Sequence, residues 1–260
     1  MEKISLVIIT YNAEMDLARC IESARMVVDE IIVLDSFSAD STENIARQYG
    51  ALFFQQKFSG YKEQKNAAVN FASNNFILSL DADEALSPEL AQSIQAIKAK
   101  PGYLAFTMNR ANLFCDRFIK HGLWYPDRKI RLFDKRIARW GGMNPHDKII
   151  LNDGTESKHL KGDLLHYSYY SEEKLIRRNE EITTIAANSL YLHDTGRQRF
   201  KIFLSPAWRF LYGYIFKLGF LDGRHGFLIA KHTANQGYLK YKKLNQLYKQ
   251  RKATVATNVS

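Results

Sequence analysis

An apolar run that ends in a group of acids, residues 76–84, constrains the fold of this chain more than any other feature. Phe76 to Leu80 form an aliphatic and aromatic stretch with one serine, which is typical of a buried strand. Asp81, Asp83 and Glu84 follow at once. Because ligands bind at the carboxyl ends of the strands in open α/β sheets, the sequence predicts a sheet that delivers these acids to a binding edge.

The two aspartates can share one divalent cation, since Asp81 and Asp83 stand two residues apart on backbone that leaves the sheet. Such a cation keeps several waters and bridges substrate phosphates. The alternative is an ordinary acidic turn ahead of the next helix, because Ser87-Pro88-Glu89 has the form of an N-cap followed by proline at the first helical position. An Asp-x-Asp pair alone does not decide between these interpretations.

Strands and helices alternate along the first hundred residues. Apolar strands without polar alternation are typical of a parallel sheet covered on both faces, and the alternation predicts right-handed crossovers. The sequence therefore predicts an α/β fold. We expect strands at 5–10, 30–34, 51–54 and 76–80 and helices at 13–26, 40–50, 63–73 and 88–98.

The pattern changes after residue 101. Strands are predicted at 103–109 and 129–133, and they are separated by a long aromatic and charged loop. A second loop, 140–147, contains two glycines and ends in His146-Asp147. A mixed sheet with long loops after a nucleotide-type half is where an acceptor site would be built.

Positive charge is concentrated in the last quarter of the chain. The net charge is +10, yet residues 197–260 contain thirteen Lys/Arg and one acid, Asp222. This asymmetry needs an explanation. We expect an α/β domain at 1–170, which divides near residue 100, a basic helical region at 171–252 that is expected to associate with a membrane, and a disordered tail at 253–260.

Three interpretations of the basic segment 197–252 compete. An amphipathic helix with a cationic polar face would lie on an anionic membrane surface. A basic aromatic patch can instead bind nucleic acid, or the aromatic residues can pack on the rest of the protein while the cations stay solvated. The chain contains no recognised nucleic-acid motif, so we expect an anionic membrane surface as partner and no nucleic acid.

Polar side chains stand at the ends of three predicted strands: Thr10-Tyr11-Asn12, Asp35, and Asp81 with Asp83. Each has a simpler explanation, since Tyr11 can pack, Asp35 can close an Asx turn and Thr10 can cap a helix. Three in succession favour a binding cleft. The glycine-rich dinucleotide and P-loop motifs are absent, so phosphates would need a metal and a cation. The candidate cations are Lys62, Lys65 and Arg128.

Four motifs resemble those of family 2 glycosyltransferases in order and spacing. They are Ser5-Leu-Val-Ile-Ile-Thr-Tyr-Asn12, Ile31-Ile-Val-Leu-Asp-Ser-Phe-Ser-Ala-Asp-Ser-Thr42, Glu63-Gln-Lys-Asn66 and Leu80-Asp-Ala-Asp-Glu84. The resemblance covers residues 1 to about 166.

Later segments look like the subgroup that acts on the lipopolysaccharide inner core, which includes β-1,4-glucosyltransferases that add glucose to the first heptose. These segments are 124–127, 131–133, 145–147, 166–168 and 219–223.

The resemblance implies a GT-A nucleotide-diphospho-sugar transferase fold, a Rossmann-like mixed sheet, and inverting transfer from a UDP-sugar. It implies that residues 1–170 are the catalytic domain, with a donor-binding half at 1–100 and an acceptor half at 101–170. Thr10, Tyr11 and Asp35 would line the base and ribose site, and Asn12 is a further donor-binding candidate. By the same resemblance Asp81 faces the ribose or the metal, and Asp83 holds Mg²⁺ or Mn²⁺ on the diphosphate. Lys65 stands where the family usually carries arginine, and Arg128 is a further donor-binding candidate.

An inverting displacement needs a carboxylate to take the acceptor proton, and the resemblance favours Asp147 as this base. The subgroup more often has His-Glu here, so this chain carries the shorter acid, with His146 as a residue that could orient it. The alternative is a surface pair between Asp147 and Lys148. His166 is a candidate metal ligand, and its alternative is a structural histidine.

Together these features predict a metal-dependent inverting hexosyltransferase that moves glucose from UDP-glucose to lipopolysaccharide inner-core heptose. No apolar run reaches the length of a spanning helix, and Cys20 and Cys115 are expected to be free thiols. We therefore expect a cytoplasmic protein, peripheral at the inner face of the inner membrane. The alternatives are a polyprenyl-phosphate or other glycolipid glycosyltransferase of the same family, and a basic nucleotide- or membrane-binding protein without turnover.

Overall fold

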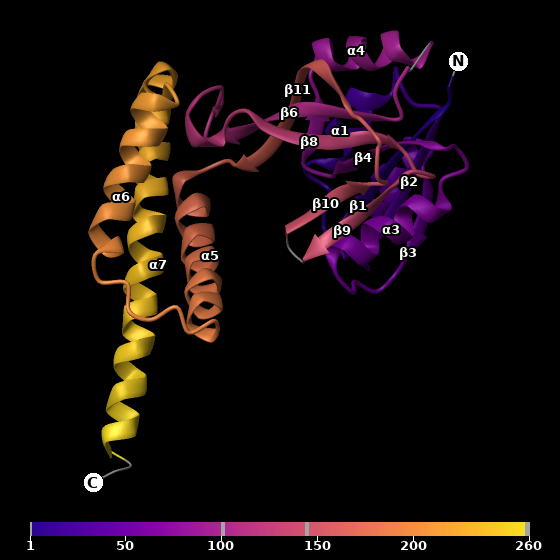
Figure 1. The fold of residues 1–260 in the computed structure, drawn as a ribbon. Coiled ribbons are helices and arrows are strands. Elements are labelled where there is room, and N and C mark those ends of the chain that lie inside the picture. Colours follow the sequence, from indigo (N-terminus) through magenta and orange to yellow (C-terminus); the bar gives the residue numbers. More distant parts are fainter. Residues whose placement is uncertain (1, 100–101, 144–145, 258–260) are drawn as a thin grey trace. The chain divides into compact units, whose positions relative to one another are not determined.

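The computed structural model describes residues 2–99, 102–143 and 146–257 (Figure 1). The chain divides into two compact units. The first contains residues 1–111 and 127–167, and the second contains residues 112–126 and 168–260. The segment 112–126 thus packs with the C-terminal helices, although the sequence places it within the acceptor half.

A nine-stranded mixed sheet has the order β3-β2-β1-β4-β8-β6-β11-β5, with β7 beside β6. β1 is parallel to β2 and β4, and β2 is parallel to β3. β8 is antiparallel to β4 and β6, as is β5 to β11. The predicted α/β fold with a mixed sheet is confirmed. The strands are β1 (Ile4–Thr10), β2 (Glu30–Asp35), β3 (Leu52–Gln55), β4 (Phe76–Asp81), β5 (Glu84–Leu86), β6 (Ala105–Phe114), β7 (Arg117–Phe118), β8 (Asp127–Asp134), β9 (Ala138–Met143), β10 (His146–Leu151) and β11 (Lys158–Tyr169).

Alternate side chains of the parallel strands enter two separate cores. Leu6 and Ile8 of β1 join a cluster that is closed by α1, α2 and α4, whereas Val7 joins a cluster closed by α3 and the β9–β10 hairpin. This is the alternation expected of strands covered on both faces. The helices of this unit are α1 (Leu17–Ala24), α2 (Thr42–Gln48), α3 (Tyr61–Phe71) and α4 (Pro88–Lys98).

The sequence signals at the ends of α4 are confirmed in the structure. The Ser87 hydroxyl accepts a hydrogen bond from the Leu90 N–H at 3.2 Å, and proline occupies the first turn. β5 separates this cap from Asp81 at the end of β4 and from Asp83 in the turn that follows. The Asp81–Asp83 pair is therefore not the cap of the next helix.

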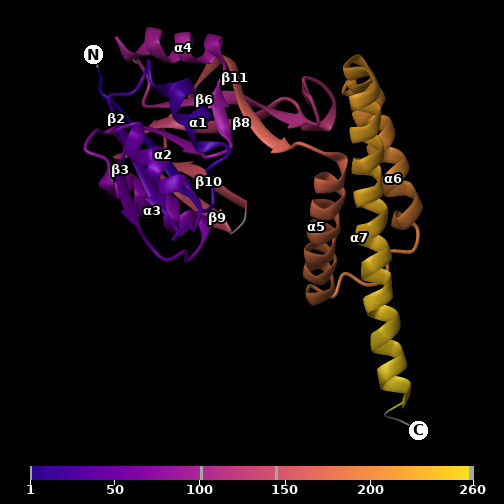
Figure 2. The ribbon, with the colours of Figure 1, turned by 180° about the vertical axis from the view of Figure 1, so that it is seen from behind.

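The second unit is built mainly from helices: α5 (Glu172–Leu192), α6 (Lys201–Leu211), η2 (Tyr212–Phe216), η3 (Gly219–Asp222) and α7 (Gly223–Thr257), with η1 (Gly122–Trp124) in the loop. Two views show α5 and α6 on opposite sides of α7 (Figures 1 and 2). α7 extends into the segment for which the sequence predicts disorder, and residues 258–260 lie outside the described part. Among the described residues, no helix combines the length and apolarity needed to cross a bilayer.

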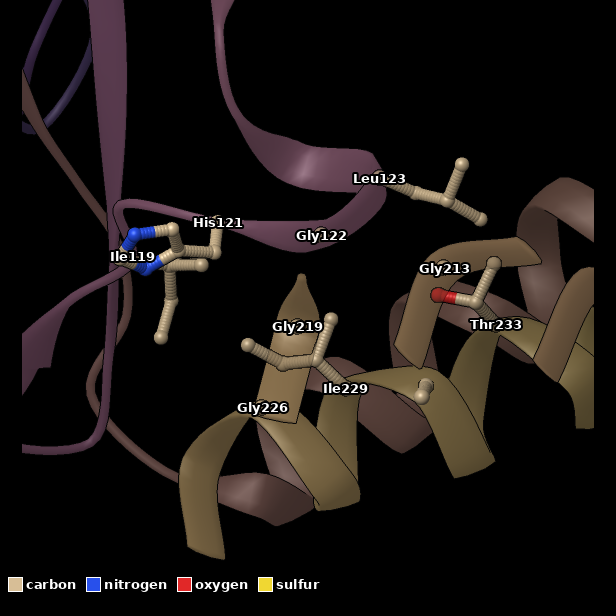
Figure 3. A pocket seen from close by; sticks show the side chains of 10 residues that line it. Ile119, His121, Gly122, Leu123, Gly213, Gly219, Gly226, Ile229 and Thr233 are labelled. Carbon is tan, nitrogen blue, oxygen red and sulfur yellow. The ribbon is translucent and has the colours of Figure 1, made fainter. Parts of the chain in front are cut away.

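The loop 119–123 lies against the helices of this unit through a seam of glycines (Figure 3). Beneath the loop, η3 and α7 approach each other closely. A Cβ at Gly226 of α7 would stand 1.8 Å from the carbonyl oxygen of Gly219 in η3, so only glycine permits this contact between η3 and α7. Asp222 fixes the loop, because its buried carboxylate accepts the N–H groups of Lys120 and His121 at 3.1 and 2.8 Å. The one acid of the basic segment is therefore structural.

Candidate active site

The three predicted strand ends meet at one edge of the sheet. β1 lies between β2 and β4, and the register pairs Thr10 with Asp35 and Ile9 with Asp81. Neighbouring strands are about 4.8 Å apart, so the polar groups that follow them are side by side. The predicted convergence of Thr10, Asp35 and Asp81 is confirmed.

Thr10 and Asp35 are buried and bonded to each other. The Thr10 hydroxyl donates to Asp35 Oδ1 at 2.8 Å. Asp35 also accepts the Ser38 N–H at 2.7 Å and the Ser38 hydroxyl, which closes the turn after β2. The Asp35 side chain thus closes the loop after β2 by bonding a residue three positions on, not the two of an Asx turn, and Thr10 and Asp35 hold the loops of the edge by these hydrogen bonds.

Tyr11 and Asn12 are the exposed members of this strand end. The Tyr11 side chain is 67% exposed, so the alternative that it packs in the core is wrong. Asn12 has φ 49°, and its side-chain oxygen accepts the Ala39 N–H at 2.9 Å. Two loops are therefore joined beside an accessible aromatic ring, which is a surface suited to stacking a base.

Lys65 joins the end of β4 to the β9–β10 hairpin. It extends from α3, is 5% exposed, and places its Nζ 2.8 Å from Asp81 Oδ1 and 2.9 Å from Asp147 Oδ2. The Asp147 side chain is 9% exposed. Asp147 is therefore a member of this buried cluster, and the alternative of a surface pair with Lys148 is wrong. The side chain of His146, predicted to orient Asp147, lies outside the described part.

Arg131 completes the neutralisation of Asp81. It is buried on β8, and its Nη2 lies 2.8 Å from Asp81 Oδ2 and 2.7 Å from Glu84 Oε1. Both oxygens of Asp81 are thus engaged by cations. Asp81 fits a role in holding Lys65 and Arg131 at the edge better than a role as metal ligand.

The electrostatics of Asp81 follow from these contacts. Burial alone would raise the pKa of Asp81, but the charges of Lys65 and Arg131 outweigh it and hold the pKa well below its usual range. Burial would likewise lower the pKa of Arg131, and Glu84 with Asp81 raises it instead. Asp81 and Arg131 are therefore both charged at neutral pH.

Trp140 provides a buried aromatic platform for both cations. Lys65 Nζ lies 4.2 Å and Arg131 Cζ 5.3 Å from the ring centroid, within the range of cation–π attraction. Asn66 fixes the backbone of Trp140, since it accepts the N–H at 3.0 Å and donates to the carbonyl at 3.0 Å. The Glu63-Gln-Lys-Asn66 motif thus contributes a cation and the amide that anchors its platform.

Asp83 and His166 form a separate pair next to this cluster. Asp83 Oδ2 lies 3.3 Å from His166 Nε2, and the side chains are 39% and 18% exposed. β11 keeps them adjacent, because His166 pairs with Glu84 of β5 and the Tyr167 N–H donates to the Asp83 carbonyl at 2.9 Å. The predicted proximity of these two residues is confirmed.

These two side chains fit a hard cation that takes its other ligands from substrate and water. The described residues contain no group of three or more His, Cys, Asp and Glu side chains arranged to hold a metal. Mg²⁺ and its analogues are bound in this way, by one or two protein ligands together with substrate phosphates. The donor set of Asp83 and His166 is compatible with that arrangement.

The described contacts do not join the other two candidate cations to this cluster. Arg128 is exposed on β8, where its backbone pairs with Asn109, and no contact with the acids of the site is described for it. Lys62 lies 3.1 Å from the neighbouring Glu63. Of the three cations predicted from the sequence, Lys65 alone is joined to Asp81 and Asp147 among the described contacts.

Arg131 and Trp140 are the site residues that sequence reasoning missed, whereas Glu84 is predicted among the acids of this edge without its partner Arg131. Arg131 stands in a strand whose next residues are Leu132 and Phe133, and a cation within such an apolar strand signals a buried partner. Its partner Glu84 directly follows the Asp-x-Asp motif. Trp140 gave no comparable signal, because a tryptophan in a glycine-containing loop is as readily a core residue.

Comparisons with known proteins agree with this architecture. A family profile described as "Glycosyl transferase family 2" matches residues 5–161. An uncharacterized glycosyltransferase of Rickettsia typhi is 30% identical over 269 residues, covering 99% of this chain and 92% of that protein. The lipopolysaccharide core biosynthesis glycosyltransferase LpsC of Rhizobium meliloti is 24% identical and covers 94% of this chain and 92% of its own length.

Two solved structures are also similar to this chain. Residues 1–349 of S. aureus TarS in complex with UDP match with a TM-score of 0.46 and 15% identity, over 95% of this chain and 91% of that chain. Glucosyl-3-phosphoglycerate synthase from Mycobacterium tuberculosis, in complex with Mn²⁺, UDP and glucosyl-3-phosphoglycerate, matches with a TM-score of 0.35 and 23% identity, over 44% of each chain.

Proposed function

This chain belongs to glycosyltransferase family 2, and we propose that it transfers glucose from UDP-glucose to a heptose of the lipopolysaccharide inner core with inversion at the anomeric carbon. The observation that carries the proposal is the joining of three elements at one sheet edge. Lys65 links Asp81 of the central strand to Asp147 of the hairpin, and the Asp83–His166 pair lies beside them.

The donor would lie across the ends of β1, β2 and β4. Tyr11 offers an exposed ring to the base, and Asn12 holds the adjoining loop through Ala39. Asp83 and His166 would hold Mg²⁺ or Mn²⁺, which when bound neutralises the diphosphate as it leaves. Lys65 stands within the same cluster, where its charge would favour the growing negative charge of the leaving group.

Asp147 is the proposed base. Its side chain is 9% exposed and pairs with Lys65, and its carboxylate would accept the proton of an acceptor hydroxyl. The proton would move to a carboxylate oxygen as the hydroxyl attacks the anomeric carbon. Two kinds of residue thus have separate roles. The cations would stabilise the negative charge of the departing diphosphate, and one carboxylate would activate the acceptor hydroxyl.

The acceptor and the location rest on different support. LpsC is named for lipopolysaccharide core biosynthesis, and its similarity extends over 94% of this chain. The thirteen Lys/Arg of residues 197–260 suit an anionic membrane surface, where a phosphorylated glycolipid would be embedded. We therefore place the enzyme, as part of the proposal, at the inner face of the inner membrane.

A transfer assay tests the proposal. Purified enzyme, Mn²⁺ and UDP-glucose would be incubated with a heptose-terminated lipopolysaccharide core, and UDP release and the mass of the acceptor would be measured. We expect UDP release that requires the acceptor, an increase of one hexose in acceptor mass, and a β-linkage by NMR. Transfer from UDP-galactose or UDP-N-acetylglucosamine alone would replace glucose in the proposal, and no transfer from any UDP-sugar would overturn it.

A further inference from the structure

One helix of the second unit turns its apolar side outward. Large apolar side chains recur every three or four residues through α6 and η2, which places them along one side of a helix. Their exposed fractions include 82% at Phe200, 73% at Phe203 and 59% at Trp208. We name this set the α6–η2 face: Phe200, Phe203, Leu204, Trp208, Leu211, Ile215 and Phe216.

The side of α6 that packs on α7 is mixed in character. A Cβ at Gly237 of α7 would meet Ser205 Oγ at 3.0 Å and Arg209 Cδ at 3.1 Å. Arg209 also donates to the Thr233 carbonyl of α7 at 3.5 Å, and the Phe210 ring lies 5.8 Å from the Phe227 ring of α7. A surface helix of a globular protein ordinarily exposes its polar side. α6 instead exposes the large apolar residues of the α6–η2 face within its own unit, so this face is available to another phase.

A row of contacting aromatic rings runs along α6 and η2. Trp208 stacks on Tyr212 with centroids 5.6 Å apart, and Tyr212 lies 6.3 Å from Phe216. Tryptophan and tyrosine are enriched where an apolar phase meets water, because their rings are apolar and their N–H or O–H groups stay hydrated. The row is therefore suited to the boundary between headgroups and acyl chains.

The surroundings of this face are cationic. Lys201, Lys217 and Arg224 are exposed on α6, after η2 and on α7. The single acid of residues 197–260, Asp222, is 3% exposed and binds the loop at Lys120. No exposed carboxylate of this segment therefore opposes an anionic surface.

Charge and side-chain type decide among the possible occupants. A second copy would bring two cationic surfaces together, which is repulsive. Single-stranded nucleic acid binds through bases that stack on aromatic side chains, and the aliphatic Leu204, Leu211 and Ile215 do not provide such stacking. Acyl chains between anionic headgroups match both the aliphatic residues and the cations.

We propose that the α6–η2 face inserts into the interface of an anionic bilayer, lying in the plane of the membrane. This proposal rests on the proposed function in one respect: a membrane-embedded glycolipid acceptor explains why the enzyme would dock on a bilayer. The insertion itself is independent of the sugar, the donor and the base.

Vesicle binding tests the insertion with the full-length protein. Vesicles of phosphatidylcholine, with and without an equal part of phosphatidylglycerol, would be titrated and the bound fraction measured by sedimentation. We expect binding to anionic vesicles that weakens at 1 M salt, where the Debye length is about 3 Å. Phe203→Ser and Phe216→Ser should each weaken it about tenfold or more, because each removes one inserted aromatic side chain.

Leu192→Ser is the matched control. Leu192 is 81% exposed at the end of α5 and lies outside the face, so this variant should bind vesicles as the wild type does. Equal weakening by all three variants, or undiminished binding by the two face variants, would overturn the proposal. Binding to RNA or dimerisation that is lost with the same two variants, without vesicle binding, would overturn it in favour of those partners.

Fluorescence quenching of the wild type keeps the test decisive if a serine variant fails to fold. Brominated acyl chains should quench a fraction of the tryptophan emission, and Trp208→Phe should abolish that quenching while circular dichroism stays unchanged. Of the other two tryptophans, Trp140 is 2% exposed, and Trp124 packs against Phe114 and Tyr169 outside the α6–η2 face. Quenching that persists in Trp208→Phe would overturn the assignment of the face.

Transfer to a soluble, delipidated acceptor separates this inference from the proposed function. Phe203→Ser should leave that transfer unchanged and should slow transfer to vesicle-embedded acceptor. Vesicle binding without any transfer would overturn the proposed function alone, and transfer without vesicle binding would overturn the insertion alone.

Discussion

Asp147→Asn removes the negative charge that faces Lys65 and keeps the size of the side chain and one oxygen acceptor. In the structure Lys65 Nζ lies 2.9 Å from Asp147 and 2.8 Å from Asp81. The lysine therefore keeps a carboxylate partner after the substitution. This second partner is what allows the catalytic and the structural effects to be separated.

The loss of stability should be modest. Breaking a buried ion pair costs about 3–5 kcal/mol when a charge is left uncompensated. Lys65 is still compensated by Asp81, so we expect a decrease in the free energy of unfolding of about 1–3 kcal/mol, the value of one hydrogen bond to a charged group. Urea unfolding followed by circular dichroism measures this difference.

The loss of activity should be large. A positioned general base contributes about 10²- to 10⁴-fold to the rate, so kcat should fall by that factor while the affinity for UDP changes little. Steady-state transfer assays at saturating acceptor give kcat, and calorimetry gives the affinity for UDP. Across the pH range, the residual activity of the variant should no longer depend on the ionisation of this carboxylate.

Asp153→Asn is the matched control, since Asp153 is exposed in the turn after β10 and undergoes the same chemical change. It should change neither kcat nor stability beyond about 0.5 kcal/mol. A kcat for Asp147→Asn within a few-fold of the wild type, together with lowered stability, would show that Asp147 is a structural partner of Lys65 and refute its role as base.

Three further predictions follow from the site. Arg131→Met removes the buried cation that pairs with Asp81 and Glu84 and should lower the free energy of unfolding by about 3–5 kcal/mol. Arg128→Gln, at an exposed position of the same strand, should change the free energy of unfolding by no more than about 0.5 kcal/mol. Equal effects of the two substitutions in urea unfolding would contradict the argument from burial. The pKa of Asp81 is lower in the folded than in the unfolded chain, so the contribution of its ionised form to stability is fully present above the unfolded value of about 4 and is lost as the pH falls further. The free energy of unfolding, measured from pH 6 downward, should therefore decline less steeply in Asp81→Asn than in the wild type. An unchanged slope would argue against this role of Asp81. Asp83→Ala should weaken UDP binding in Mn²⁺ and leave binding in EDTA unchanged, and calorimetry that shows equal weakening in both would exclude Asp83 as the metal ligand.

Local pattern and one topological rule were enough to predict the sheet edge. The apolar runs ending at Thr10, Asp35 and Asp81 are recognisable strands, and the carboxyl ends of parallel strands lie at the same edge. Convergence follows without knowledge of any tertiary contact. The same rule does not say which of the three side chains stays accessible, and the structure buries Thr10 and Asp35.

The contact between Lys65 and Asp147 could not be derived from the sequence. The two residues are 82 positions apart, and the hairpin that brings Asp147 to α3 is set by packing of Trp140 and Ile149 on Ala68. No local propensity reports such a long-range contact. The resemblance to a family suggested Asp147, but its partner emerged from the structure.

The orientation of α6 was beyond sequence reasoning for a related reason. Cations and aromatics alternate in residues 197–252, which is equally consistent with packing inward and with facing outward. The close approach at Gly237 decides, because it admits the Ser205 and Arg209 side of the helix and leaves Trp208 outside. Where a helix is amphipathic, its neighbours determine which side is hidden.

Calorimetric titration of the wild-type protein with UDP, and separately with GDP, in Mn²⁺ and then in EDTA tests the central claim most directly. The account predicts that UDP binds in the presence of Mn²⁺, that EDTA weakens the binding, and that GDP binds much more weakly. Absence of binding for both nucleotides in Mn²⁺ would contradict a donor site at the edge formed by Thr10, Asp35 and Asp81.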